Sequence, residues 1–202
     1  MTQPVGGCSF PETPDRPATD ARLFWRPDLD ASVVDIDAAT ASPDDPDAFD
    51  VGQFDDLVTL LRHTDGHESL SFSDGVHHLQ LEIVEGSVTA GPVRLHYRLS
   101  GFRFVEAQAL TVRRLAQLRR LGRFPRNLFP PEPRAHRWVM ALRAYDGMAD
   151  GASHRDIATV LFGKQTVHDD WSGRSGYLRL RIQRLIRGAE KMVCGGYREL
   201  LG

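Results

Sequence analysis

The stretch GASHRDIATVLFG, residues 151–163, decides how the second half of the chain folds. Ser153 can accept a hydrogen bond at the start of a helix, and Asp156 stands three residues later, where the acid of a capping box reaches back. The apolar residues that follow share one helical face: Ile157, Ala158 and Leu161. Glycine adopts the left-handed conformation at little cost, so Gly163 is expected to end the helix. These features are typical of the first helix of a helix-turn-helix.

A second amphipathic helix is predicted over residues 174–192. Its inward positions recur at intervals of three and four residues: Leu178, Ile182, Leu185, Ala189 and Met192. Its outward face carries Arg174, Tyr177, Arg181 and Arg184, with Arg179 and Arg187 flanking that face. The segment between the two helices, residues 164–176, is longer than the three or four residues of a standard helix-turn-helix turn. We therefore expect an extended turn there, anchored to the core by Val167 and Trp171.

The arginine-rich face favours binding to double-stranded DNA. Arginine forms forked hydrogen bonds with guanine edges and with phosphates. Residues near the start of such a helix reach base edges, and later ones reach phosphates. A solvated helix face is the alternative interpretation, but such faces usually mix charges for pairing between residues four apart. No acidic residue lies between Ser172 and Gly188.

Charge is divided unevenly along the chain, although the formal net charge of all 202 residues is only −2. Residues 1–110 hold 7 Lys and Arg against 19 Asp and Glu, a charge of −12. Residues 111–202 hold 18 against 8, a charge of +10, and 16 of those 18 are arginine. This asymmetry favours a basic half that binds a partner and an acidic half with another task. It also motivates the hypothesis that the acidic half folds over the basic half and shields it.

Two further helices are predicted between residues 102 and 148. Residues 102–121 have helical spacing and a stop at Gly122, and their apolar stripe is Val105, Ala109, Val112, Leu115 and Leu118. Their arginines either follow flanking phosphates or are solvated: Arg113, Arg114, Arg119 and Arg120. Pro133 can open the next helix, residues 134–148. That helix offers three side chains to the core: Trp138, Leu142 and Tyr145.

Residues 21–101 are predicted to be rich in strands. Short strands are expected in ARLFWRP (residues 21–27) and SVVDID (residues 32–37). Apolar and polar residues alternate over residues 68–99, which predicts three or four antiparallel strands. Three dipeptides indicate turns between them: Asp74-Gly75, Glu85-Gly86 and Gly91-Pro92. The exception is residues 51–63, whose apolar residues follow helical spacing and predict a short helix.

The composition is that of an ordinary soluble protein, with 41% hydrophobic and 26% charged residues. No apolar run approaches the roughly 20 residues that a membrane helix requires, and the first residues lack the pattern of a signal peptide. Cys8 and Cys194 fit no metal or redox spacing. We expect a reducing, cytoplasmic setting and no membrane partner.

The sequence predicts no catalysis, no metal site and no cofactor. His63 and His67 have the spacing of a helical metal pair, but the residues between them favour a turn. His77 and His78 are adjacent, and adjacent residues of a strand point to opposite faces. The segment FGKQT, residues 162–166, does not fit a phosphate-binding loop. Ala158 stands where the first glycine of that motif is required, and Gln165 stands where its Ser or Thr is required.

Three motifs in the second half resemble a proteobacterial family of helix-turn-helix variants. They are FPRNLFPPEPRAHRWVMALRAYDG (residues 124–147), GASHRDIATVLFG (residues 151–163) and DWSGRSGYLRLRIQRLIRGAEKMVCGGYRELL (residues 170–201). The family includes the excision activators and antiactivators of integrative and conjugative elements, the FseA/QseM type. The resemblance covers residues 123–202 well and residues 21–122 more loosely. It implies transcriptional control, with Arg174, Ser175, Arg179, Arg181 and Arg184 on or near the recognition helix.

The predicted architecture is α+β: a disordered tail (1–20), an acidic β-rich region (21–101) and an arginine-rich helical DNA-binding domain (102–202). The predicted function is sequence-specific transcriptional regulation, activator-like by analogy with the longer family members and directed at conjugative-element transfer genes. The alternative is an antiactivator that captures another regulator. The predicted partner is double-stranded DNA, with another transcriptional regulator or RNA polymerase as further partners. The candidate DNA-binding residues are Arg174, Ser175, Tyr177, Arg179, Arg181, Arg184 and Arg187.

Overall fold

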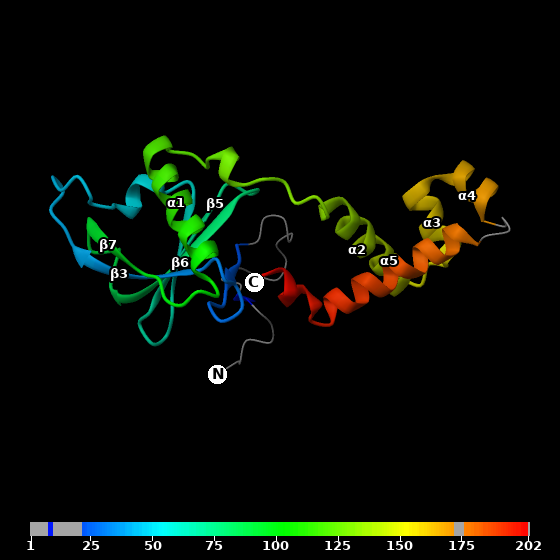
Figure 1. The fold of residues 1–202 in the computed structure, drawn as a ribbon, viewed down its shortest axis with the longest axis horizontal. Coiled ribbons are helices and arrows are strands. Elements are labelled where there is room, and N and C mark those ends of the chain that lie inside the picture. Colours follow the sequence, from blue (N-terminus) through cyan, green and yellow to red (C-terminus); the bar gives the residue numbers. More distant parts are fainter. Residues whose placement is uncertain (1–7, 10–21, 172–175, 202) are drawn as a thin grey trace. The chain divides into compact units, whose positions relative to one another are not determined.

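The computed structural model describes residues 8–9, 22–171 and 176–201. Strands come first along the chain and helices follow, so the predicted α+β class is confirmed (Figure 1). The chain divides into two compact units. Unit 1 comprises residues 1–130 together with 201–202, and unit 2 comprises residues 131–200.

Unit 1 is built on a five-stranded sheet. Its strands are β3 (Val34–Thr40), β4 (Val58–Arg62), β5 (Glu68–Ser73), β6 (His78–Gly86) and β7 (Val93–Arg98). A separate pair consists of β1 (Cys8–Ser9) and β2 (Phe24–Trp25). The sheet order is β4-β5-β6-β3-β7, in which β3 runs parallel to β6 and antiparallel to β7. Three strands follow residue 68, where three or four were expected, but β3 lies between the last two of them.

The helix predicted over residues 51–63 is wrong for most of its length. Only Val51–Phe54 are helical, as the 3₁₀ helix η1, which begins where the Asp50 carboxylate accepts a hydrogen bond of 3.0 Å from the Gly52 amide. The following residues form β4, which pairs antiparallel with β5. The hydrogen bonds between β4 and β5 satisfy the backbone N–H and C=O groups of this segment, and the β-branched Val58 suits a strand. Pairing with a distant strand therefore outweighs the local helical spacing.

Gly86 is the last residue of β6 and not the middle of a turn, as the Glu85-Gly86 pattern had predicted. Its φ is 84°, and a Cβ atom there would lie 2.0 Å from the carbonyl oxygen of Ala38 on β3. The register between β3 and β6 shifts beside this contact, between Ile36 and Asp37. Glycine is needed here because the two backbones approach too closely for a side chain.

Helix α1 (Val105–Leu121) packs in unit 1, and Gly122 ends it in the left-handed conformation, as predicted. Leu115 and Leu118 are buried in one core with the sheet residues. The sequence grouped this helix with the helical residues 102–202, whereas the contacts divide the chain after Pro130. The physical reason is the apolar stripe of α1, which is buried against the sheet.

Two of the α1 arginines are held by unit 1. The Arg114 guanidinium donates to the Leu128 carbonyl at 2.9 and 3.0 Å, and it lies 4.0 Å from the centre of the Phe129 ring. Arg119 donates to the carbonyls of Pro46 and Ala48 at 2.7 and 2.9 Å. These groups have internal partners, so they are poor candidates for flanking phosphate contacts.

Unit 2 is helical. Its elements are α2 (Ala135–Ala149), α3 (His154–Phe162), α4 (Lys164–Asp170), α5 (Tyr177–Val193) and the 3₁₀ helix η3 (Gly196–Leu200). The small residues Ala141 and Ala144 are the buried positions of α2. Leu142 was expected in the core but is 44% exposed, and this expectation is wrong. The alanines let α5 pack closely on α2, which turns the larger Leu142 away from the core.

Glu68 is the most heavily hydrogen-bonded buried acid of unit 1. Its carboxylate, 4% exposed, accepts from Arg62 at 2.8 Å, from the Ser87 hydroxyl at 3.0 Å and from the Val88 amide at 3.1 Å. Burial raises the pKa of this carboxyl, but the hydrogen bonds together outweigh burial and hold the pKa below its ordinary value.

We expect Glu68→Gln to lower the free energy of unfolding of unit 1 by about 1–3 kcal/mol, because charge-assisted hydrogen bonds are lost. A depressed pKa stabilises the fold above the ordinary pKa of glutamate, and this contribution disappears as pH falls through the lower folded-state value. Denaturant unfolding of both proteins at neutral and acidic pH measures this, and the difference should shrink in acid. Glu85→Gln, at a carboxylate that is 74% exposed, is the control. A Glu68 variant as stable as this control at neutral pH contradicts the prediction.

Candidate nucleic-acid interface

The start of α3 has the predicted capping box. The Ser153 hydroxyl accepts from the Asp156 amide at 3.2 Å, and the Asp156 carboxylate accepts from the Ser153 amide at 3.2 Å. Ile157 and Ala158 are buried, as expected from their spacing. The first helix of the expected helix-turn-helix therefore forms where the sequence places it.

Gly163 joins α3 directly to α4, and the extended turn expected over residues 164–176 is wrong for 164–170. Gly163 has φ 88° and ψ 153°, which is a positive φ but not the left-handed helical conformation that was predicted. One residue thus redirects the chain into another helix. Within α4, the Gln165 side-chain amide donates to the Asp169 carboxylate at 3.0 Å, which supports a helix. Val167 is buried and Trp171 packs against the core, so their predicted anchoring role is confirmed.

Helix α5 buries one face and exposes the other. The buried set is Leu178, Ile182, Leu185, Ile186 and Ala189. Four of these were predicted, Ile186 was not, and the predicted Met192 is only half-buried. The opposite face is exposed and carries Arg179, Arg181, Arg184 and Arg187. Tyr177, the first residue of α5, is 58% exposed, and Arg174 and Ser175 lie outside the described residues.

Two of the α5 arginines lie over aromatic rings of the neighbouring helices. The Arg181 guanidinium is 4.3 Å from the ring centre of Phe162 in α3, and the Arg179 guanidinium is 5.8 Å from that of Trp171, directly after α4. Cation–π contacts of this kind restrict a long side chain. An arginine that is already restricted loses less conformational entropy when it binds a ligand.

The charge of these arginines is not neutralised by the described part of unit 2. Among the residues described, Arg179, Arg181, Arg184 and Arg187 form no ion pair. We call these four residues the α5 arginine strip. An exposed strip of like charge on one helix attracts a polyanion and repels a basic surface. The strip is therefore suited to the phosphate backbone and base edges of DNA.

The sequence interpretation missed one exposed arginine of α3. Arg155 on α3 is exposed and stands seven residues before Phe162, so the two lie on the same side of their helix. Arg181 stacks on that same Phe162. Arg155 is therefore a further candidate for DNA contact, and its seven-residue spacing from Phe162 could have suggested it from the sequence.

The division into two units also changes the charge contrast. Residues 131–200 hold 12 Lys and Arg against 8 Asp and Glu, a formal charge of +4. The remaining residues hold 13 against 19, a charge of −6. The contrast is smaller than the −12 and +10 of the two sequence halves, because the arginines of α1 and of the following connection belong to unit 1. The charge argument for shielding between the halves is weaker by the same amount.

Three histidines of unit 1 make structural contacts. His63 and His78 each have a ring nitrogen within hydrogen-bonding distance of a serine hydroxyl, Ser69 at 2.7 Å and Ser71 at 3.1 Å. His77 pairs with Asp74 at 2.8 Å and packs against the rings of Phe124 and Phe129. Among the described residues, no cluster of three or more His, Cys, Asp or Glu could hold a metal ion.

In the same part of the chain, no helix combines the length and the apolar character needed to cross a membrane.

A capped helix that packs on a second helix with an exposed arginine face is the arrangement found in helix-turn-helix DNA-binding domains. Residues 101–202 match the family model RovC_DNA-bd, described as "T6SS, Transcription factor, DNA binding domain". The chain belongs to this family. No curated protein matches the chain. The family is a class of DNA-binding transcription factor domains, not of enzymes, and the match confirms the expected regulator class without extending to the conjugative-element type.

Proposed function

We propose that the protein is a sequence-specific transcriptional regulator that places α5 in the major groove of DNA. The observation that carries the proposal is the α5 arginine strip, four exposed guanidinium groups without an ion pair among the described residues, on a helix fixed by its buried face. The family to which the chain belongs supports DNA as the partner.

Position along α5 suggests the role of each residue. Arg179 and Arg181 lie near the start of α5, where side chains of a recognition helix reach base edges. Arg184 and Arg187 lie one and two turns further on and suit phosphates. Tyr177 and the preceding Arg174 and Ser175 complete the candidate set, and Arg155 extends it onto α3.

Two groups of genes are candidates for regulation by this protein. The family description names T6SS, so genes of such a system are the first candidates for regulation. Control of conjugative-element transfer genes is supported by the resemblance of the three C-terminal motifs. Activation as the sign of control is supported by the acidic, strand-rich first half, by analogy with the longer, activator-like members of that family.

A protein partner is the competing proposal, because the same unneutralised arginines fit an acidic surface on another regulator or on RNA polymerase. The test is binding of the full-length protein to DNA from beside its own gene, against a scrambled duplex, at several salt concentrations. We expect a preference on the order of 10³-fold or more for the cognate duplex. The salt dependence should give a slope of about −0.9 for each phosphate contacted. Binding without sequence preference contradicts the proposal and favours the protein partner.

A further inference from the structure

Unit 2 has an apolar groove between α2 and the C-terminal half of α5, closed at one side by η3. Its volume is about 510 Å³, within the range of roughly 300–1,000 Å³ that small-molecule sites occupy. The apolar side chains that line it include Trp138, Leu142, Leu185, Met192, Val193 and Leu200. Leu142, Val193 and Leu200 are 44%, 49% and 41% exposed, so the groove is open to an occupant.

Gly188 keeps this groove open. It lies in the interior of α5, where glycine is less favourable for a helix than alanine. Its φ is not positive, and a Cβ atom built there meets nothing within 4 Å. Neither the backbone nor a close neighbour therefore requires a glycine at this position. The absence of a side chain at Gly188 leaves space in the wall of the groove.

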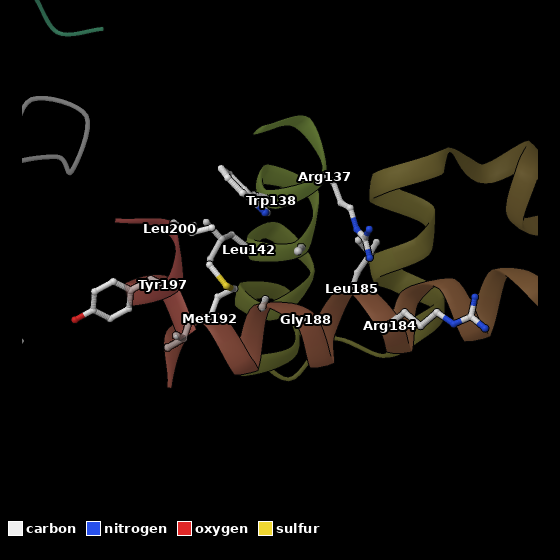
Figure 2. A pocket seen from close by; sticks show the side chains of 12 residues that line it. Arg137, Trp138, Leu142, Arg184, Leu185, Gly188, Met192, Tyr197 and Leu200 are labelled. Atoms are coloured by element: carbon white, nitrogen blue, oxygen red, sulfur yellow. The ribbon is translucent and has the colours of Figure 1, made fainter. Parts of the chain in front are cut away.

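Two arginines give the groove a cationic end. Arg137 of α2 and Arg184 of α5 both line it, and Figure 2 shows both toward one end and Tyr197 toward the other. In the described residues neither guanidinium has a hydrogen bond or an ion pair with a neighbour. An apolar trough with unpaired cations at one end fits a molecule with an apolar body and one anionic group.

We propose that this groove binds an apolar organic carboxylate, with the tail along Gly188 and the carboxylate at Arg137 and Arg184. This proposal rests on the proposed function. Arg184 lines the groove and also belongs to the α5 arginine strip, so the ligand regulates the same helix that binds DNA. A carboxylate bound to Arg184 neutralises a charge that DNA needs. The ligand therefore lowers affinity for DNA, and by linkage DNA lowers affinity for the ligand by the same factor.

The binding test uses the full-length protein, decanoate as the probe and calorimetric titration. We expect saturable binding of one decanoate with a Kd below roughly 1 mM. Decanol, which has the same tail without the charge, should bind about tenfold more weakly. Arg137→Gln should reduce that preference for decanoate over decanol while leaving the affinity for decanol unchanged.

Two variants at Gly188 test the location. Gly188→Leu fills the groove and should weaken decanoate binding at least about tenfold, while the helix gains propensity and the unfolding temperature stays level or rises. Gly188→Ala, which adds one methyl group, should give a smaller loss and also a higher unfolding temperature. No saturable binding, equal binding of decanol, or unchanged binding by both glycine variants overturns the proposal.

A DNA-binding measurement with and without decanoate separates the two proposals. If the ligand-free protein prefers its cognate duplex and decanoate weakens that binding in the natural protein but not in Gly188→Leu, the regulatory proposal is supported. If decanoate binds at the groove and DNA affinity does not change, the regulatory link is overturned. If the ligand-free protein has no sequence preference, the proposed function fails while the titrations still decide whether the groove binds carboxylates.

Discussion

Replacing Arg181, Arg184 and Arg187 together by glutamine is expected to weaken binding to the cognate duplex by roughly 10²- to 10⁴-fold, which corresponds to about 1–2 kcal/mol for each arginine. These three side chains are exposed on one side of α5 and have no ion pair among the described residues. Their loss removes contacts to DNA without removing any buried group. The helical circular dichroism and the unfolding temperature should therefore stay close to those of the natural protein.

Salt dependence separates the roles of the three arginines. Each phosphate contact that is lost should flatten the slope of log K against log salt by about 0.9. A base contact instead costs roughly 1–3 kcal/mol on the cognate duplex and little on random DNA. The single variant Arg181→Ala should behave as a base contact, and Arg187→Ala should behave as a phosphate contact. Fluorescence anisotropy with labelled cognate and scrambled duplexes at several salt concentrations measures both quantities.

The matched control is the triple variant Arg134→Gln, Arg143→Gln and Arg198→Gln. It removes the same charge from unit 2 but leaves α5 intact. The long-range attraction that depends on total charge falls equally in the two triple variants, whereas direct contacts to DNA are lost only in the α5 variant. A similar loss of cognate binding in both would therefore place the effect in overall charge and contradict a recognition role for α5.

The local features of the second half could be predicted because they depend on short stretches of sequence. The capping box at Ser153 needs only residues three apart, and the buried face of α5 follows from its 3.6-residue period. Helix α4 could not be predicted in this way. Seven residues with a single buried side chain, Val167, have too short an apolar pattern to separate a helix from an anchored turn.

The site was only partly predictable for a similar reason. Spacing placed the α5 arginines on the exposed side of the helix, because the apolar residues had to be inside. It could not show that Arg181 of α5 lies over Phe162 of α3, since this depends on how the two helices pack. Nor could it show the apolar groove, to which Leu142 contributes because Ala141 and Ala144 take the buried positions of α2.

In unit 1 the missed features all involve pairing between distant segments. Leu60 lies opposite Leu70 in the sheet, although residues 57–61 have the spacing of a helix. Strand β3 lies between β6 and β7, although the alternating pattern of residues 68–99 suggested neighbouring hairpins. A pattern in one segment shows which residues are buried but not which distant segment covers them.

The domain to which α1 belongs is also not evident from its own sequence pattern. The family match and the contacts in the structure assign α1 to different domains. The family match begins at residue 101 and includes α1, whereas the contacts group α1 with the sheet and divide the chain after Pro130. A family match records which residues are inherited together, and contacts record which residues are buried together. The energetics of one buried α1 side chain can decide which grouping describes the folded protein.

Leu118→Ala is expected to lower the free energy of unfolding of unit 1 by about 2–5 kcal/mol, because it removes a fully buried side chain and leaves a cavity. Leu118 is 0% exposed and shares its core with Ile36, Leu81 and Phe124. Hydrogen exchange in the full-length protein should show protection lost in β3 and β6 and kept in α2 and α5. The control is Leu121→Ala in the same helix, at a side chain that is 42% exposed, where the loss should stay within about 0.5 kcal/mol. Equal loss of protection in α5 and in β3 would instead mean that α1 stabilises the DNA-binding helices, and the functional domain would then begin at residue 101, as the family match does.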